Sequence, residues 1–189
     1  MRKIFLMIIL TSILFYNAAA QPESDNKPQV RGKSNQVSLN LNIPFEGYLK
    51  DISNFGIGIQ YEWSKKRFGS MTSKPAKLIG FTFNIGADHY FGEKESIGMY
   101  SVKYKRTSYL HAYGGAIYNP CTGGNLSLTA GPTIELYDGN SEFGFGVNLS
   151  GGFYMSKCRN IGITPNTSLM KQGSSEAVFA GGVRLNYTF

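Results

Sequence analysis

The sequence has few of the side chains that build metal centres and disulfide frameworks. Its 189 residues include two histidines and two cysteines. His89, His111, Cys121 and Cys158 lie far apart in the sequence and match no metal-ligand spacing. The closely spaced glycines Gly56/Gly58 and Gly144/Gly146 lie inside strand-like stretches with no helix after them, so they do not form a nucleotide-binding loop. The sequence therefore predicts no metal site and no cofactor.

Long hydrophobic runs are also absent after residue 20, which excludes a transmembrane helix there. The first twenty residues have a basic start (Met1–Lys3), an apolar core (Ile4–Phe15) and a small-residue end (Ala18–Ala20). The apolar core is shorter than the roughly 20 residues of a spanning helix, which argues against a membrane anchor. We predict that residues 1–20 are a cleaved signal peptide and that the product is exported to an oxidising compartment.

A strong excess of charge is missing too. The formal net charge is +7, and it falls to +5 when a signal peptide containing Arg2 and Lys3 is removed. No basic run alternates with aromatic residues in the way that nucleic-acid-binding segments do. Nucleic acid is therefore not an expected partner.

Alternation with a period of two residues is abundant, and it is clearest at the end of the chain. From Ala177 to Phe189 one face is mostly apolar and aromatic, whereas the other is small or polar and carries only Arg184. A period of two is typical of a β-strand. A final strand that ends in Tyr187 and Phe189 must bury its apolar row against something, and lipid is one candidate.

The same alternation recurs along the chain after a polar stretch, residues 21–35, that we expect to be a disordered lead-in. Eight strand-like stretches follow: Gln36–Phe45, Asn54–Trp63, Lys77–Phe91, a stretch within Ser101–Tyr118, Asn125–Tyr137, Phe143–Ser156, Asn160–Met170 and Ala177–Phe189. Most have the length that a tilted strand needs to cross a bilayer. Aromatic residues near their ends match the positions of interfacial girdles. We predict an all-β fold, an eight-stranded antiparallel transmembrane β-barrel over residues 36–189.

An even number of strands places both chain ends on one side, which we expect to be the periplasm. Segments 46–53, 92–104, 138–142 and 171–175 would then face outward, and segments 64–76, 119–124 and 157–160 would face the periplasm. Segment 64–76 is long and basic for a periplasmic turn. Either this barrel departs from the usual short turns, or the strand count is wrong by one.

Two stretches carry a resemblance to known proteins: the terminal GGVRLNYTF, and LSLTAGPTIELYDGNSEFGFGVNLSGGFYMS before it. They resemble the small outer-membrane β-barrel superfamily of Gram-negative bacteria, the OmpA/OmpX-like barrels, especially the porin-family forms of Bacteroidetes. The resemblance implies an outer-membrane location, contact with membrane lipid and lipopolysaccharide, and insertion by the barrel-assembly machinery. It also implies that Tyr187 and Phe189 belong to the C-terminal signal which that machinery reads.

Four charged residues are predicted to point into the barrel: Glu62, Asp88, Glu135 and Arg184. An eight-stranded barrel is just wide enough for side chains to fill it. Because a lone buried charge is costly, we expect these residues to form a polar network that stabilises the interior. The functional alternative is a narrow polar pore or a proton path.

Small barrels also include enzymes, the lipid A deacylases and palmitoyl transferases. The deacylase type has a His-x-Ser pattern on the outer wall, because a serine hydroxyl needs a base. His89 and His111 are followed by Tyr-Phe and Ala-Tyr, so neither matches the pattern. His89 could still pair with Asp88 or Glu93 near the rim, although an interfacial histidine is the simpler interpretation.

Cys121 and Cys158 are predicted to lie in turns on the same rim. Two strands separate those turns, which at ~4.8 Å per strand puts the cysteines about 10 Å apart. A disulfide needs Cα atoms within ~7 Å, so the bond forms only if the turns lean together.

These observations favour a non-enzymatic outer-membrane barrel with a structural, anchoring or surface-interaction role, presenting the loop near 92–104. Two alternatives stay open. One is a lipid-modifying enzyme with His89 or His111 as its base. The other is a secreted soluble β-sandwich or lipocalin-like binder, which would bury the apolar faces in its own core.

Overall fold

A computed structural model describes residues 33–66, 78–97, 100–121, 124–154, 161–173 and 176–189 of the chain. Eight long strands form a closed barrel in the order β1-β10-β9-β8-β7-β6-β3-β2, and each pairs antiparallel with its neighbours. Their bounds are β1 Lys33–Glu46, β2 Gly56–Lys66, β3 Leu78–Tyr90, β6 Thr107–Cys121, β7 Gly124–Tyr137, β8 Asn140–Tyr154, β9 Ile161–Gln172 and β10 Val178–Thr188. The predicted eight-stranded antiparallel barrel is confirmed.

The wall of the barrel has its apolar residues on the outside. Phe143 is 70% exposed and Phe81 is 68% exposed, and the same face of each strand carries further exposed Leu, Ile, Phe and Val. The opposite face is buried and mostly polar, as with Asn84, Asn148 and Thr129. This distribution contradicts the soluble lipocalin-like alternative, because the outward apolar side chains do not meet one another across the interior. Hydrocarbon is the surrounding that such a wall requires.

Several boundaries differ from the predicted ones. β1 begins at Lys33, so residues 33–35 belong to the barrel and not to the lead-in. β6 begins at Thr107, within the predicted stretch Ser101–Tyr118, and runs on to Cys121. Residues 67–76, the later part of the long basic segment 64–76, lie outside the described residues.

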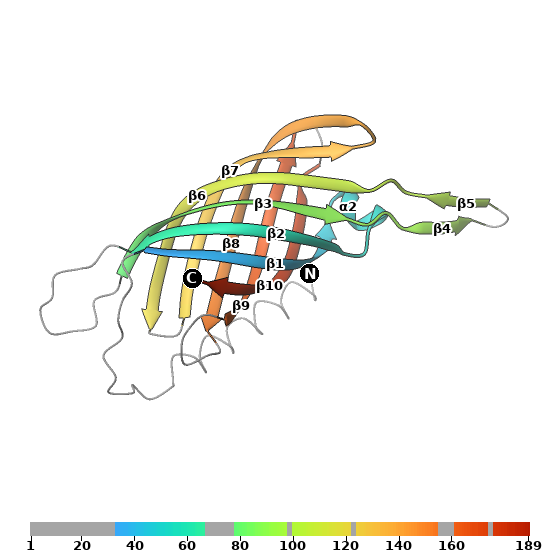
Figure 1. Cartoon of the computed structure of the whole chain (residues 1–189). Coiled ribbons are helices and arrows are strands. Elements are labelled where there is room, and N and C mark those ends of the chain that lie inside the picture. The colour runs from blue at the N-terminus through green and yellow to red at the C-terminus, as the bar shows by residue number, and fades with distance from the viewer. Residues whose placement is uncertain (1–32, 67–77, 98–99, 122–123, 155–160, 174–175) are drawn as a thin grey trace, which may run out of the picture.

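An additional hairpin interrupts the connection between β3 and β6. It consists of β4 (Lys94–Ile97) and β5 (Tyr100–Lys103), and it projects beyond one end of the barrel (Figure 1). We call this end the hairpin end. The other end, the terminal end, holds the start of β1 and the end of β10, where the Phe189 amide donates to the Asn35 carbonyl over 3.0 Å.

A short helix, α2 (Tyr48–Ile52), closes the hairpin end (Figure 1). Its Leu49 is fully buried and packs against inward-pointing side chains of four strands, namely Tyr90, Tyr109, Met170 and Val178. Tyr48 and Ile52 pack against the same cluster. The barrel therefore has a polar interior that ends in an apolar plug.

The turn into this plug depends on Gly47. Its φ is 85°, a left-handed conformation that other residues adopt at a cost. A β-carbon at this position would lie 2.6 Å from the Ala177 carbonyl oxygen and 3.0 Å from the Val178 Cα. Because the obstacle is backbone, no side-chain rotation relieves it.

We predict that Gly47→Ala destabilises the barrel more than Gly139→Ala does. Gly139 has a similar φ of 81° but open space around its Cα. The Gly139 variant should lose about 1 kcal/mol from backbone strain, and the Gly47 variant about 3 kcal/mol from strain plus the clash. Urea unfolding of the detergent-solubilised proteins measures both. Equal losses would show that the close contact with β10 does not matter.

Candidate functional site

The polar interior is organised around Asp88 of β3. Its Oδ1 accepts hydrogen bonds from the Asn42 Nδ2 at 2.7 Å and the Asn40 Nδ2 at 3.2 Å, both from β1. Its Oδ2 lies 3.5 Å from the His111 Nδ1 of β6. The β2 residue beside Asp88 is Gly58, whose absent side chain leaves room for the carboxylate. Two strands, β1 and β6, thus supply polar partners to one buried carboxylate, and β2 supplies the space for it.

Arg184 of β10 supplies the positive charge of this interior. Its side chain is 4% exposed and interacts electrostatically with Asp88, Glu62 and Tyr113. Arg184 therefore interacts electrostatically with two of the three predicted interior acids. A nearby opposite charge lowers the cost of burying a charged group.

Glu135, the fourth predicted member, lies elsewhere in the interior. It accepts a hydrogen bond from the Tyr48 hydroxyl of α2, and that hydroxyl also contacts Tyr109. In the ladder Glu135 is directly opposite Glu142 of β8. Its role is at the plug, where it holds α2 in the barrel mouth.

Two further side chains, those of His111 and Tyr113, belong to the interior cluster and were not predicted to do so. His111 is 5% exposed and stacks on Tyr113, with ring centroids 4.8 Å apart. A signal was present, because both residues share the parity of buried Tyr109 on β6. This inward position contradicts the hypothesis that His111 acts as a base on the outer wall, since the barrel wall separates it from lipid.

His89 does lie on the outer face, and the fold supplies a serine that the sequence pattern did not reveal. Ser108 is directly opposite His89 in the β3–β6 ladder, and its Oγ lies 2.8 Å from the His89 Nδ1. The His89 ring also contacts Phe91 in a T-shaped arrangement with centroids 5.0 Å apart. The neighbouring Asp88 is turned inward and cannot orient this imidazole.

The remaining predicted residues stay as expectations. Cys121 ends β6, but Cys158 lies outside the described residues, so the disulfide stays open. Tyr187 and Phe189 are both exposed and stack with centroids 6.4 Å apart at the terminal end. Over the described ranges, no group of three or more His, Cys, Asp or Glu side chains could hold a metal ion.

Comparisons with known proteins agree with this geometry. No protein-family model matches the chain, and no curated protein matches its sequence. Among solved structures, Ail, the attachment invasion locus protein of Yersinia pestis, superposes with a TM-score of 0.57 at 12% identity, covering 85% of this chain and all of Ail. Its complex with the heparin analogue sucrose octasulfate gives 0.57 at 9% identity and covers 84% of this chain and all of Ail. The Ail backbone in phospholipid nanodiscs gives 0.53 at 11% identity, with 84% of this chain and all of Ail covered.

The chain has the fold of the small eight-stranded outer-membrane β-barrels. The low identity means that these likenesses establish the fold and leave the role open. No helix in the described part of the chain is long and apolar enough to cross a membrane. An outer-membrane location is supported by the structural neighbours and by the apolar outer wall.

We predict that Arg184→Leu lowers the stability of this barrel by about 3–5 kcal/mol, because Asp88 and Glu62 lose their buried counter-charge. Detergent-solubilised protein, followed by urea unfolding or by its heat-modifiable migration on a gel, measures the loss. Adding Asp88→Asn to Arg184→Leu should recover part of it, since fewer uncompensated charges then remain. An unchanged melting behaviour for Arg184→Leu would contradict the network.

Proposed function

We propose that this chain is a non-catalytic outer-membrane barrel whose hairpin end faces outward and contacts anionic surface polymers. The observation that carries the proposal is the β4–β5 hairpin, a ribbon that extends beyond a closed barrel (Figure 1). The apolar wall anchors the barrel in lipid and lipopolysaccharide. In this scheme Tyr187 and Phe189 lie at the periplasmic side, where the assembly machinery would read them.

The closed interior supports a role at the barrel end over a role as a channel. The plug of Leu49, Tyr90, Tyr109, Met170 and Val178 is almost fully buried. Below it the interior is filled by side chains, as the size of an eight-stranded barrel leads one to expect. A surface-interaction role therefore depends on segments that project beyond the barrel, such as the β4–β5 hairpin.

The charge of the hairpin region favours an anionic partner. Residues 93–106 contain four basic and two acidic residues. The register places Lys94 directly opposite Lys103 in the ribbon. At its base Lys105 forms an ion pair with Asp138, which joins the region to the β7–β8 turn, and Arg106 is exposed. The excess of basic residues in this region suits an anionic partner.

A likeness in fold supports the choice of probe. The superposable Ail structure holds a heparin analogue, sucrose octasulfate. Heparin is therefore a suitable polyanion with which to test the hairpin of this chain.

We predict that Lys94→Glu/Lys103→Glu weakens binding to immobilised heparin about tenfold at 0.15 M salt, because two attractive charges become repulsive. The matched control is Lys65→Glu/Lys66→Glu, which makes the same change of charge at the terminal end and should bind like wild type. Heat-modifiable migration verifies that both variants fold. Equal loss in the two variants would indicate a general charge effect and contradict the hairpin site.

A second candidate function is favoured by the hydrogen bond between His89 and Ser108. The pair could act on a lipid ester at the outer wall. The Ser108 Oγ would attack the acyl carbon while its proton moves to the His89 Nδ1 and then to the leaving alkoxide, and water would release the acyl group. The inward turn of Asp88 leaves the imidazole without the neighbouring carboxylate that would orient it, so we place this function second.

We predict that a fluorophosphonate probe labels wild type and Ser108→Ala to the same low extent in lipid nanodiscs, as the non-catalytic proposal requires. Lipid A isolated with and without the protein should likewise have the same mass. His89→Phe serves as the matched variant for the base. Labelling that disappears in both variants would instead establish the enzymatic function.

A further inference from the structure

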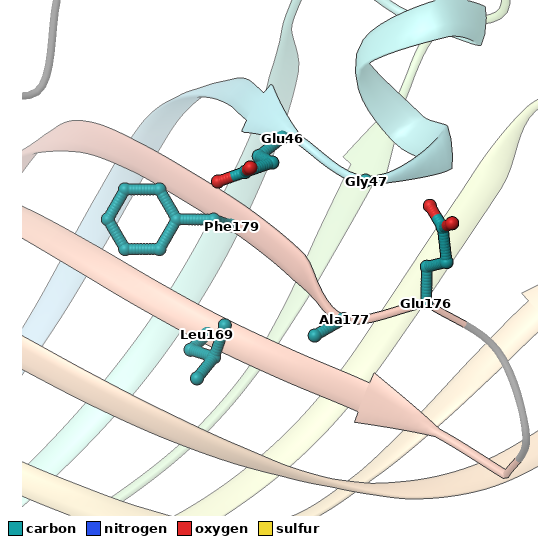
Figure 2. A pocket seen from close by; sticks show the side chains of 6 residues that line it. All are labelled: Glu46, Gly47, Leu169, Glu176, Ala177 and Phe179. Carbon is teal, nitrogen blue, oxygen red and sulfur yellow. The ribbon is translucent and has the colours of Figure 1, made fainter. Parts of the chain in front are cut away.

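Polar side chains at the rim of this barrel have access to solvent that those of the interior lack. At the hairpin end, Glu46 and Glu176 are exposed near the contact between Gly47 and Ala177 (Figure 2), where water or lipid headgroups can solvate them. Side chains buried inside the wall have no such access. Each polar atom there therefore needs a hydrogen-bond partner within the barrel.

One row of interior side chains crosses the seam at which the barrel closes. Ser38 of β1 is directly opposite Asn186 of β10 on one side and Gln60 of β2 on the other. We call these three residues the seam row. None of them is more than 3% exposed, so bulk solvent does not reach their side chains.

The polar atoms of the seam row lack partners on the protein. Among the residues that the structure describes, none forms a hydrogen bond with the Ser38 Oγ, the Asn186 Oδ1 or either polar atom of the Gln60 amide. The next row along the strands repeats this pattern. There the Arg184 Nε and the Asn40 Oδ1, which belong to directly opposite residues, have no partner within the described ranges either. A buried donor or acceptor without a partner is costly, so these atoms indicate a bound molecule.

The imidazole of His111 extends the same row. Gly86 of β3 is directly opposite Gln60, and His111 of β6 is directly opposite Gly86. A β-carbon on Gly86 would lie 2.7 Å from the His111 Nε2, so this nitrogen lies over the glycine next to Gln60. The Nε2 has no hydrogen-bond partner in the described part of the chain. Four strands thus contribute unpartnered polar atoms to one cross-strand row.

The chemistry of these atoms favours water over an ion. The Gln60 Nε2 and the Ser38 hydroxyl can donate hydrogen bonds, whereas the Gln60 Oε1 and the Asn186 Oδ1 can only accept them. An anion would leave the acceptors unpaired, and a metal cation would leave the donors unpaired. A water molecule both donates and accepts. Directly opposite residues have Cβ atoms ~4.5–5.5 Å apart, a spacing that suits a bridging water between short side chains.

We propose that the seam row binds ordered water, which bridges Asn186, Ser38 and Gln60 and joins β10, β1 and β2 from within the barrel. The His111 Nε2 belongs to the same water network. Buried waters typically make about three hydrogen bonds, which matches the number of side chains in the row. The site lies inside the wall and does not depend on the β4–β5 hairpin or its partner.

The test is a crystal structure of the detergent-solubilised full-length protein at a resolution that shows ordered water. A water should lie within ~3.2 Å of the Gln60 amide and of Ser38 or Asn186. Gln60→Met keeps the approximate shape of the side chain without its amide. This variant should lose the water and raise the equilibrium constant for unfolding in urea about tenfold. The control is Gln172→Met, which removes a buried glutamine whose Nε2 donates to the Thr133 Oγ1 over 3.0 Å, and it should keep the water.

Three results would overturn the proposal. One is a wild-type structure in which the seam-row side chains bond directly to one another with no water between them. Another is an unfolding constant that falls in Gln60→Met, because removing a buried amide that has no partner at all stabilises a protein. The third is a bound species held only by oxygen atoms at ~2.4 Å, the spacing of a metal cation. Heat-modifiable migration verifies that the variants fold, and the wild-type crystal structure decides the question by itself if one does not.

Discussion

Every backbone amide and carbonyl in hydrocarbon must be paired within the protein, and a closed ring of strands meets this requirement. In this chain the closure is the pairing of β1 with β10, which joins Gln36–Glu46 to Phe179–Thr188 across almost the whole sequence. That ladder leaves the barrel wall without a free edge in the described residues. It also fixes which face of each strand meets lipid, because a shift by one residue would exchange the two faces.

Closure creates a second constraint, since an eight-stranded barrel encloses a narrow interior that polar residues must fill. Glycines provide the space for the larger side chains. A β-carbon on Gly86 would lie 2.7 Å from the His111 Nε2, and one on Gly146 would lie 2.2 Å from the Tyr113 hydroxyl. The inward glycines, which are typical of a barrel sequence, thus leave room for the side chains of His111, Tyr113 and Arg184 in one interior. The buried guanidinium charge of Arg184 is tolerated because it interacts electrostatically with Asp88 and Glu62.

The period-two pattern was sufficient to predict the wall. It assigned outward and inward faces correctly, and with them the shared interior of Glu62, Asp88 and Arg184. It could not predict where Glu135 lies, because parity gives the face of a residue and not its height in a tilted barrel. The pattern also did not predict the contact between Ser108 and His89. The register of these two residues depends on the length of the connection between their strands, residues 91–106, and not on the pattern of either strand.

The α2 plug was not predicted either, because it too depends on tertiary structure. Tyr48, Leu49 and Ile52 are too few to give a helical pattern, and only the closed mouth supplies the apolar cluster that stabilises them.

The positions of these features divide the molecule into parts with separate tasks. The wall is constrained by lipid on one face and by tight packing on the other, so it tolerates few charged groups. Departures from that rule are therefore informative, and Glu46 is one, because a bulge turns it out onto the apolar side. The hairpin is free of both constraints, since β4 and β5 pair only with each other. Recognition of a soluble partner is thus best sought on the ribbon.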